Sequence, residues 1–161
     1  MENILLRVYK SKKASLSFKI ISHLAVIISV LAYAVLLFLS FTASPTEGLS
    51  VLFSAAIPFF AVSAVRALIN APRPYEIYDF YENKPKEKAW SSFPSRQVYS
   101  SFVIATLAFV YSIPLGVSLA LLGIALAVSR VLLGIHFIRD VACGAAIGVS
   151  AGLIGIFIMV L

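Results

Sequence analysis

Long apolar runs separated by short polar segments constrain this chain more than any other feature. Hydrophobic residues make up 61% of its 161 positions, and charged residues make up only 12%. A water-soluble domain of this length needs far more surface charge, so the composition places the chain among integral membrane proteins. The first run, from about Phe18 to Phe41, is long enough to cross ~30 Å of hydrocarbon as a helix.

We therefore predict an all-α integral membrane bundle of five transmembrane helices with a short interfacial loop region, in a single domain over residues 1–161. The spans are expected at about residues 18–41, 49–70, 96–112, 115–133 and 137–161. Residues 1–16 are basic and partly apolar, which favours an interfacial segment, with a solvated tail as an equal alternative. Gly144, Gly148 and Gly152 form a small-residue seam, for which packing within the chain is favoured over dimerisation.

Ionisable side chains interrupt the apolar pattern between the fourth and fifth spans. Such groups at a membrane boundary are costly and by default mark a functional site. His136 and Asp140 are four residues apart, so on one helical face the carboxylate can accept the imidazole N–H. That contact fixes the tautomer and leaves the other ring nitrogen free to attack or to take a proton. Arg130, across a glycine-containing turn, is a bidentate donor suited to phosphate.

Two further segments carry residues suited to an anionic ligand. Arg66 and Arg73 lie two helical turns apart on one face if the second span continues to Ala71, and snorkelling at a helix end is the alternative. Pro94 and Ser95 begin the third span. Ser95 is a candidate helix cap, and the free N–H groups behind it form an anion site.

These three segments resemble the motifs of the type 2 phosphatidic acid phosphatase superfamily. Residues 129–140 match the third motif, SR-x5-H-x3-D, at every fixed position. Residues 66–74 match the first motif, K-x6-R-P, with Arg66 in place of the lysine. In the second motif, P-S-G-H, Arg96 replaces the glycine and Gln97 replaces the histidine. The resemblance covers roughly residues 55–160.

The resemblance implies a membrane lipid phosphatase in which His136 is the nucleophile and Asp140 orients it. It further implies that the phosphoryl oxygens are bound by Arg66, Arg73, Arg130 and Ser95. No metal ion or other cofactor is expected, because the arginines supply the positive charge. In the family, the histidine of the second motif protonates the leaving group.

Gln97 cannot supply that proton, because an amide has none to give at neutral pH. Losing a general acid typically costs 10²- to 10⁴-fold in rate. A phosphate ester leaving from a lipid diphosphate has a second pKa of roughly 6 and departs unprotonated, whereas an alkoxide needs the proton. We therefore expect a lipid or polyprenyl diphosphate to be preferred, with Gln97 and Arg96 donating hydrogen bonds to the retained phosphate.

Three alternatives stay open from the sequence. The chain is a catalytically weakened relative that binds lipid phosphates, or a small structural or transport subunit, or an enzyme in which His23 or a water replaces the missing acid. The second of these leaves the set of arginines, histidine and aspartate unexplained.

The charge pattern predicts the partners and the orientation of the chain. The formal net charge is +6, but the basic residues flank apolar spans and form no stripe, so lipid substrates and anionic membrane lipids are favoured over nucleic acid. With five spans, all 13 Lys and Arg fall on the side of the three motifs, including the lysines of the 84–88 loop. The positive-inside rule then places the active site on the cytoplasmic face of a bacterial cell membrane. A homo-oligomer is compatible with these observations.

Overall fold

The computed structural model describes residues 2–81 and 90–160, and within these residues the chain is helical with no strand. The helices are α1 (Glu2–Lys10), α2 (Lys12–Ala43), α3 (Pro45–Ile69), α4 (Pro74–Ile77), α5 (Arg96–Tyr111), α6 (Ile113–Leu132) and α7 (Ile138–Val160). The predicted all-α fold class is confirmed. The predicted basic loop at 84–88 lies outside the described residues.

Four helical segments in the described part of the chain are long and apolar enough to cross a membrane. These segments are α2, the stretch Pro45–Ile77 that contains α3 and α4, α6 and α7. The remaining predicted span, the third at about residues 96–112, is α5, which has only 16 residues, so the count of five is one too many by this measure. At 1.5 Å per residue a helix of this length covers about 24 Å, less than the ~30 Å thickness of the hydrocarbon.

The inner surface of the bundle is apolar, and so is much of its outer surface. Leu36, Val51, Tyr99, Val103 and Leu107 are essentially inaccessible and form the central core with their neighbours. Large apolar side chains also cover the outside, with Leu68 at 84% and Phe60 at 70% exposure. In a helix bundle, an outer surface of this kind is matched to hydrocarbon rather than to water. The chain is an integral membrane protein.

Close packing of α7 against α5 fixes the relative position of the N-terminal ends of the two helices. A Cβ atom on Gly144 would lie 2.6 Å from the carbonyl oxygen of Ser95, and one on Gly148 would lie 2.5 Å from that of Tyr99. The small-residue seam predicted from the sequence therefore packs within the chain. At the N-terminal end of this seam, the backbone N–H of Ser95 donates to the carbonyl oxygen of Asp140 at 3.0 Å. The beginnings of α5 and α7 are thus held together.

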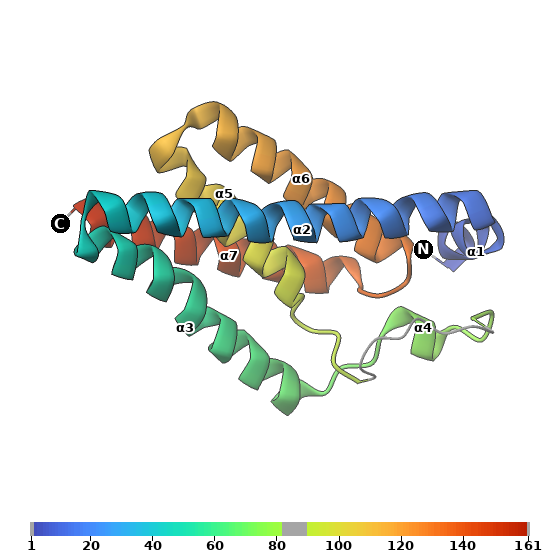
Figure 1. Ribbon diagram of the computed structural model, residues 1–161. Coiled ribbons are helices and arrows are strands. Elements are labelled where there is room, and N and C mark those ends of the chain that lie inside the picture. Colours follow the sequence, from blue (N-terminus) through green and yellow to red (C-terminus); the bar gives the residue numbers. More distant parts are fainter. Residues whose placement is uncertain (1, 82–89, 161) are drawn as a thin grey trace.

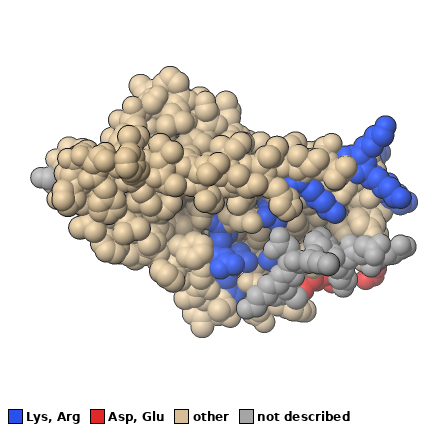
Figure 2. Space-filling view, viewed as in Figure 1, with Lys and Arg blue, Asp and Glu red and all other residues tan. Residues whose placement is uncertain are grey.

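All the segments that carry the three motifs meet at one end of the bundle (Figure 1). This end contains the beginnings of α2, α5 and α7 and the ends of α3 and α6. In Figure 2 the Lys and Arg side chains gather over this half, and the visible surface of the other half has none. The α2–α3 turn, next to Glu47, lies at the opposite end.

The basic N-terminal segment forms α1 and the first turns of α2. Ser11 begins α2, and its Oγ accepts a hydrogen bond from the N–H of Ala14 at 3.3 Å. The helix thus begins six residues before the predicted span, because a capped helix extends beyond its apolar portion. Tyr9 of α1 packs edge-on against Tyr81, with ring centroids 4.9 Å apart. Tyr81 lies against Gly134, whose φ of +69° forms the turn after α6.

Candidate active site

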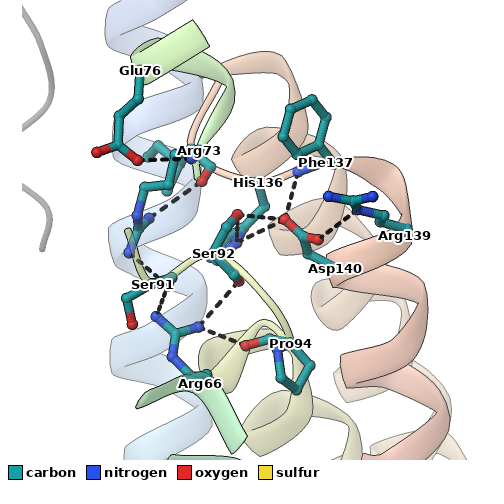
Figure 3. Close-up of polar contacts among 11 residues, drawn as sticks. Arg66, Arg73, Glu76, Ser91, Ser92, Pro94, His136, Phe137, Arg139 and Asp140 are labelled. Atoms are coloured by element: carbon teal, nitrogen blue, oxygen red, sulfur yellow. Dashed lines mark hydrogen bonds and ion pairs between the residues drawn. The ribbon is translucent and has the colours of Figure 1, made fainter. Parts of the chain in front are cut away.

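Arg66 reaches from the last turn of α3 to the backbone of residues 91–94 (Figure 3). Its Nη1 donates to the carbonyl oxygens of Ser92 at 3.3 Å and Pro94 at 2.6 Å, and its Nη2 donates to that of Ser91. The side chain is buried, at 6% exposure. Three carbonyl groups are bound by one planar guanidinium, so Arg66 holds this loop in place.

Arg73 joins the same loop to the turn before α7. Its Nη2 donates to the Ser91 carbonyl oxygen at 3.3 Å, and its Nη1 donates to that of Ile135 at 3.2 Å. Its backbone N–H donates to Glu76 Oε2 at 2.7 Å. The condition that the helix continues to Ala71 is not met, because α3 ends at Ile69 and Asn70 is left-handed with φ of 48°. The two arginines converge through this turn and not along one helical face.

His136 lies in the turn between α6 and α7, with Asp140 one turn further on in α7. The backbone N–H groups of Ile135 and His136 donate to the carbonyl oxygen of Arg130, at 3.0 and 3.3 Å. Asp140 Oδ2 accepts the backbone N–H of Phe137 at 2.9 Å, which caps the start of α7. His136 and Asp140 are both buried, with 4% and 0% exposure. The turn therefore aims both side chains into the interior of the site.

Ser92 lies between the histidine and the aspartate. His136 Nδ1 is 3.7 Å from Asp140 Oδ2, which is longer than a hydrogen bond. The Ser92 Oγ is 3.3 Å from His136 Nδ1, and it donates a short hydrogen bond to Asp140 Oδ2. The direct contact expected from the i, i+4 spacing is thus replaced by a contact through a serine hydroxyl.

The contacts of Ser92 also assign the tautomer of His136. An ionised carboxylate only accepts hydrogen bonds, so the single hydroxyl proton of Ser92 points to Asp140. The Ser92 oxygen then accepts from Nδ1–H, which leaves the lone pair of Nε2 available. Burial lowers the pKa of His136 below its ordinary value; Asp140 opposes this effect, and the charges of Arg73 and Arg66 add to it. The imidazole is therefore neutral at pH 7.

Ser95 is placed where a ligand oxygen would complete its hydrogen bonding. It is the residue before the first turn of α5, as expected, but its hydroxyl makes no capping bond. Its Oγ is fully buried and has no hydrogen-bond partner within the described residues. A buried hydroxyl without a partner is unfavourable by roughly 1–3 kcal/mol, so the position favours a bound acceptor.

Within the described residues, neither Arg96 nor Gln97 makes a hydrogen bond to this cluster. Arg96 is exposed and turns toward α3, where its Nη1 is 3.4 Å from Ser63 Oγ and its guanidinium lies 5.6 Å from the Phe59 ring centre. Gln97 lines an apolar cavity of about 230 Å³ between α2, α3, α5 and α6. His23 is exposed on α2, with Nδ1 2.7 Å from the carbonyl oxygen of Lys19 in its own helix.

Several residues of the site were not predicted from the sequence. Ser92 and Ser91 contribute a hydroxyl and a carbonyl group, Glu76 binds the backbone of Arg73, and Arg139 Nε lies 3.5 Å from Asp140 Oδ1. Glu76 and Arg139 are charged residues next to predicted motifs, which is a weak local signal. Nothing in the local sequence distinguishes Ser92 from the other serines.

The fold and the site together define an integral membrane helical protein with a buried, arginine-lined histidine at one end. The profile of the PAP2 superfamily, the type 2 phosphatidic acid phosphatases, matches residues 47–160, and the chain belongs to this superfamily. No curated protein sequence matches the chain.

Two solved structures share the fold. LpxE from Aquifex aeolicus has a TM-score of 0.73 and 24% sequence identity over 91% of this chain and 87% of that chain. A transmembrane PAP2-type phosphatidylglycerolphosphate phosphatase from Bacillus subtilis has a TM-score of 0.71 and 21% identity, over 97% of this chain and 82% of that chain. At these identities, the likeness concerns the arrangement of the helices.

Proposed function

We propose that the protein is a membrane lipid phosphatase that removes the terminal phosphate of a lipid phosphate or diphosphate through a phosphohistidine intermediate. The observation that carries this proposal is the buried His136, whose Nδ1 faces Ser92 and Asp140 while arginines surround the site. An imidazole that is neutral and held at one nitrogen offers the other as a nucleophile. Membership of the PAP2 superfamily and the structural likeness to a phosphatidylglycerolphosphate phosphatase support a lipid phosphate as the substrate.

In the proposed reaction, Nε2 of His136 attacks the terminal phosphorus while the bond from that phosphorus to its bridging oxygen breaks, and the electron pair leaves with the oxygen on the lipid alcohol or the lipid monophosphate. The ring acquires positive charge, which Asp140 stabilises. Water then attacks the phosphohistidine, the electron pair of the P–N bond returns to Nε2, and inorganic phosphate leaves while the proton of the water passes to the solvent or to the departed leaving group. Arg66, Arg73 and Arg130 supply the positive charge that a metal ion supplies elsewhere, and the buried Ser95 hydroxyl donates to a phosphoryl oxygen.

The finer part of the proposal is a preference for diphosphates. Gln97 stands where the family has its general acid, and an amide provides no proton at neutral pH. A diphosphate substrate tolerates this replacement because its leaving group is a phosphate ester with a second pKa of roughly 6. Gln97 borders the apolar cavity, which supports a role close to the lipid portion of the substrate.

The same residue favours a second candidate function. If Gln97 removes too much of the catalytic power, the protein binds lipid phosphates without turning them over. Trapping of ³²P on His136 after brief exposure to a labelled substrate separates these functions, because a binding protein forms no covalent phosphohistidine.

The deciding experiment measures phosphate release by the detergent-purified protein from phosphatidic acid and from a polyprenyl diphosphate. His136→Ala serves as the blank. We expect release from the diphosphate to be faster, and we expect Gln97→His to raise the rate on phosphatidic acid by about 10²- to 10⁴-fold. Faster release from phosphatidic acid by the wild type would contradict the preference. An inactive wild type that Gln97→His activates would assign the binding function.

A further inference from the structure

The hydroxyl of Ser92 is the only described group that contacts both ring nitrogen Nδ1 of His136 and the carboxylate of Asp140. It is 3.3 Å from Nδ1 and donates to Oδ2, whereas Nδ1 and Oδ2 are themselves 3.7 Å apart. Ser92 has 0% exposure, so water does not compete for these two contacts. The hydrogen-bonded path from Asp140 to the imidazole therefore runs through this hydroxyl, beside the direct electrostatic attraction between the carboxylate and the ring (Figure 3).

We propose that Ser92 is a positioning residue for phosphoryl transfer, because its hydroxyl couples Asp140 to His136 and fixes the Nδ1–H tautomer. The proposal deepens the function given above and rests on it. Ser92 does not touch the substrate, and it forms and breaks no covalent bond. Its contribution is to orient the ring so that Nε2 faces the phosphorus and to stabilise the charge that develops on the ring.

The backbone around Ser92 is held firmly enough for its hydroxyl to act in this way. Its own N–H donates to the carbonyl oxygen of Ala71 at 3.0 Å, and its carbonyl oxygen accepts from Arg66 Nη1 at 3.3 Å. On either side, Arg66 also binds the carbonyl oxygens of Ser91 and Pro94. Both backbone polar groups of the serine are therefore used, and its Cβ is fixed relative to the end of α3.

Through these contacts, Arg66 positions the loop that carries Ser92. A guanidinium has five N–H donors in a plane and reaches three carbonyl groups at once, whereas an ammonium group is a single point donor. Arg66 therefore sets the position of the loop, and the loop sets the position of the Ser92 hydroxyl. The lysine of the family's first motif would not provide the same three contacts.

The hydroxyl must both accept and donate, and this requirement defines the informative variants. Alanine does neither, threonine does both, and cysteine does both only weakly. We expect Ser92→Ala to lower kcat by about 10- to 100-fold with KM changed less than about threefold, as for the loss of a hydrogen bond to a charged group. Ser92→Thr should restore most of kcat, and Ser92→Cys should lie between the two.

A matched control tests whether loss of any buried serine hydroxyl has the same effect. Ser40 also has 0% exposure, and its Oγ donates to the carbonyl oxygen of Leu37 at the far end of α2. Ser40→Ala should leave kcat within about twofold of the wild type. An equal loss in both variants, or a Ser92→Ala variant with wild-type kcat, would overturn the proposal.

A second measurement is independent of activity and covers the case in which the proposed function itself fails. The chain has only two histidines, so ¹⁵N NMR of histidine-labelled protein in detergent reports His136 directly, with His23→Gln to assign the other signal. We expect the Nδ1–H tautomer in the wild type and in Ser92→Thr, and its loss in Ser92→Ala. An unchanged tautomer in Ser92→Ala would refute the coupling. If the wild type releases no phosphate and Ser92→Ala still loses the Nδ1–H tautomer, only the proposed function is contradicted.

Discussion

At the scale of single residues, the site is organised around one neutral histidine in a positively charged surrounding. His136 is buried, and its pKa is lowered mainly by that burial, with a smaller contribution from Arg73 and Arg66. The same arginines that favour a phosphate therefore keep the nucleophile unprotonated. Their guanidinium groups also bind the carbonyl oxygens of Pro94 and Ile135, so the same side chains supply positive charge and hold the backbone around the site in place.

The lowered pKa of His136 predicts how activity depends on pH. The imidazole attacks only in its neutral form, and a pKa below the ordinary value of about 6.5 keeps this form populated at lower pH. We therefore expect the acid limb of the kcat/KM profile to have its midpoint below pH 6.5. In Asp140→Asn the limb should shift to still lower pH while kcat decreases, because the carboxylate that raises the pKa of His136 is gone.

The measurement is kcat/KM against pH with a lipid diphosphate in detergent micelles. The substrate phosphates also titrate, so their own pKa must be determined separately by ³¹P NMR and used as the control. An acid limb centred above pH 6.5 after this correction would show that His136 is not the neutral nucleophile described here.

At the scale of elements, the contact between α5 and α7 decides the geometry of the site. Gly144 allows the α7 backbone to approach Ser95, and the Ser95 N–H then donates to the carbonyl oxygen of Asp140 at 3.0 Å. The residue that begins α5 is thus tied directly to the residue that faces His136. Small residues permit such close approach of helices in membranes, where there is no hydrophobic force to bring helices together.

Enlarging Gly144 should damage the site through this helix contact. In Gly144→Ala the new Cβ would lie 2.6 Å from the Ser95 carbonyl oxygen, which is backbone and cannot rotate away. We expect a loss of about 1–3 kcal/mol in stability. We also expect a lower kcat, because the start of α5 must move away from Asp140. Thermal unfolding in detergent and phosphate release measure the two effects.

Ala146→Val is the control for this prediction, because it adds bulk on the exposed face of the same helix. Its unfolding temperature and kcat should remain near those of the wild type. If Gly144→Ala is as stable and as active as the wild type, the seam does not position the start of α5.

At the scale of the whole molecule, charge divides the bundle into two ends. The Lys and Arg side chains visible in Figure 2 cover only the end that contains the site, and Glu47 lies near the α2–α3 turn at the other end. Basic residues are retained on the cytoplasmic side of membrane proteins. The distribution supports our proposal that the site faces the cytoplasm.

This orientation can be tested by labelling a single cysteine. Cys143 is the only cysteine in the sequence, so Glu47→Cys in a Cys143→Ala background provides a unique thiol at the end opposite the site. We expect a membrane-impermeant maleimide added to intact cells to label it. Ser11→Cys in the same background is the matched position at the site end and should be labelled only after the cells are opened. The reverse pattern would place the active site on the outer face.

How much of the site was predictable depends on whether the relevant signal is local. The identities of His136 and Asp140 followed from ionisable groups placed between apolar runs, and the structure does bring Arg66, Arg73 and Ser95 to the same end of the bundle. Arg96 was expected beside them, but it turns to Ser63 and Phe59 of α3. Its direction depends on where α3 lies relative to α5, which no local pattern specifies.

Hydropathy, turn residues and ionisable groups act over a few neighbouring residues, so the helices, the membrane location and the candidate catalytic groups could be predicted from the amino-acid sequence. The position of Ser92 between His136 and Asp140, and the binding of its loop by Arg66, come instead from the packing of the folded chain. These contacts join residues 26 to 48 positions apart in the chain. Such distances between atoms are set by how α3, α5 and α7 pack, which the order of the residues does not reveal locally.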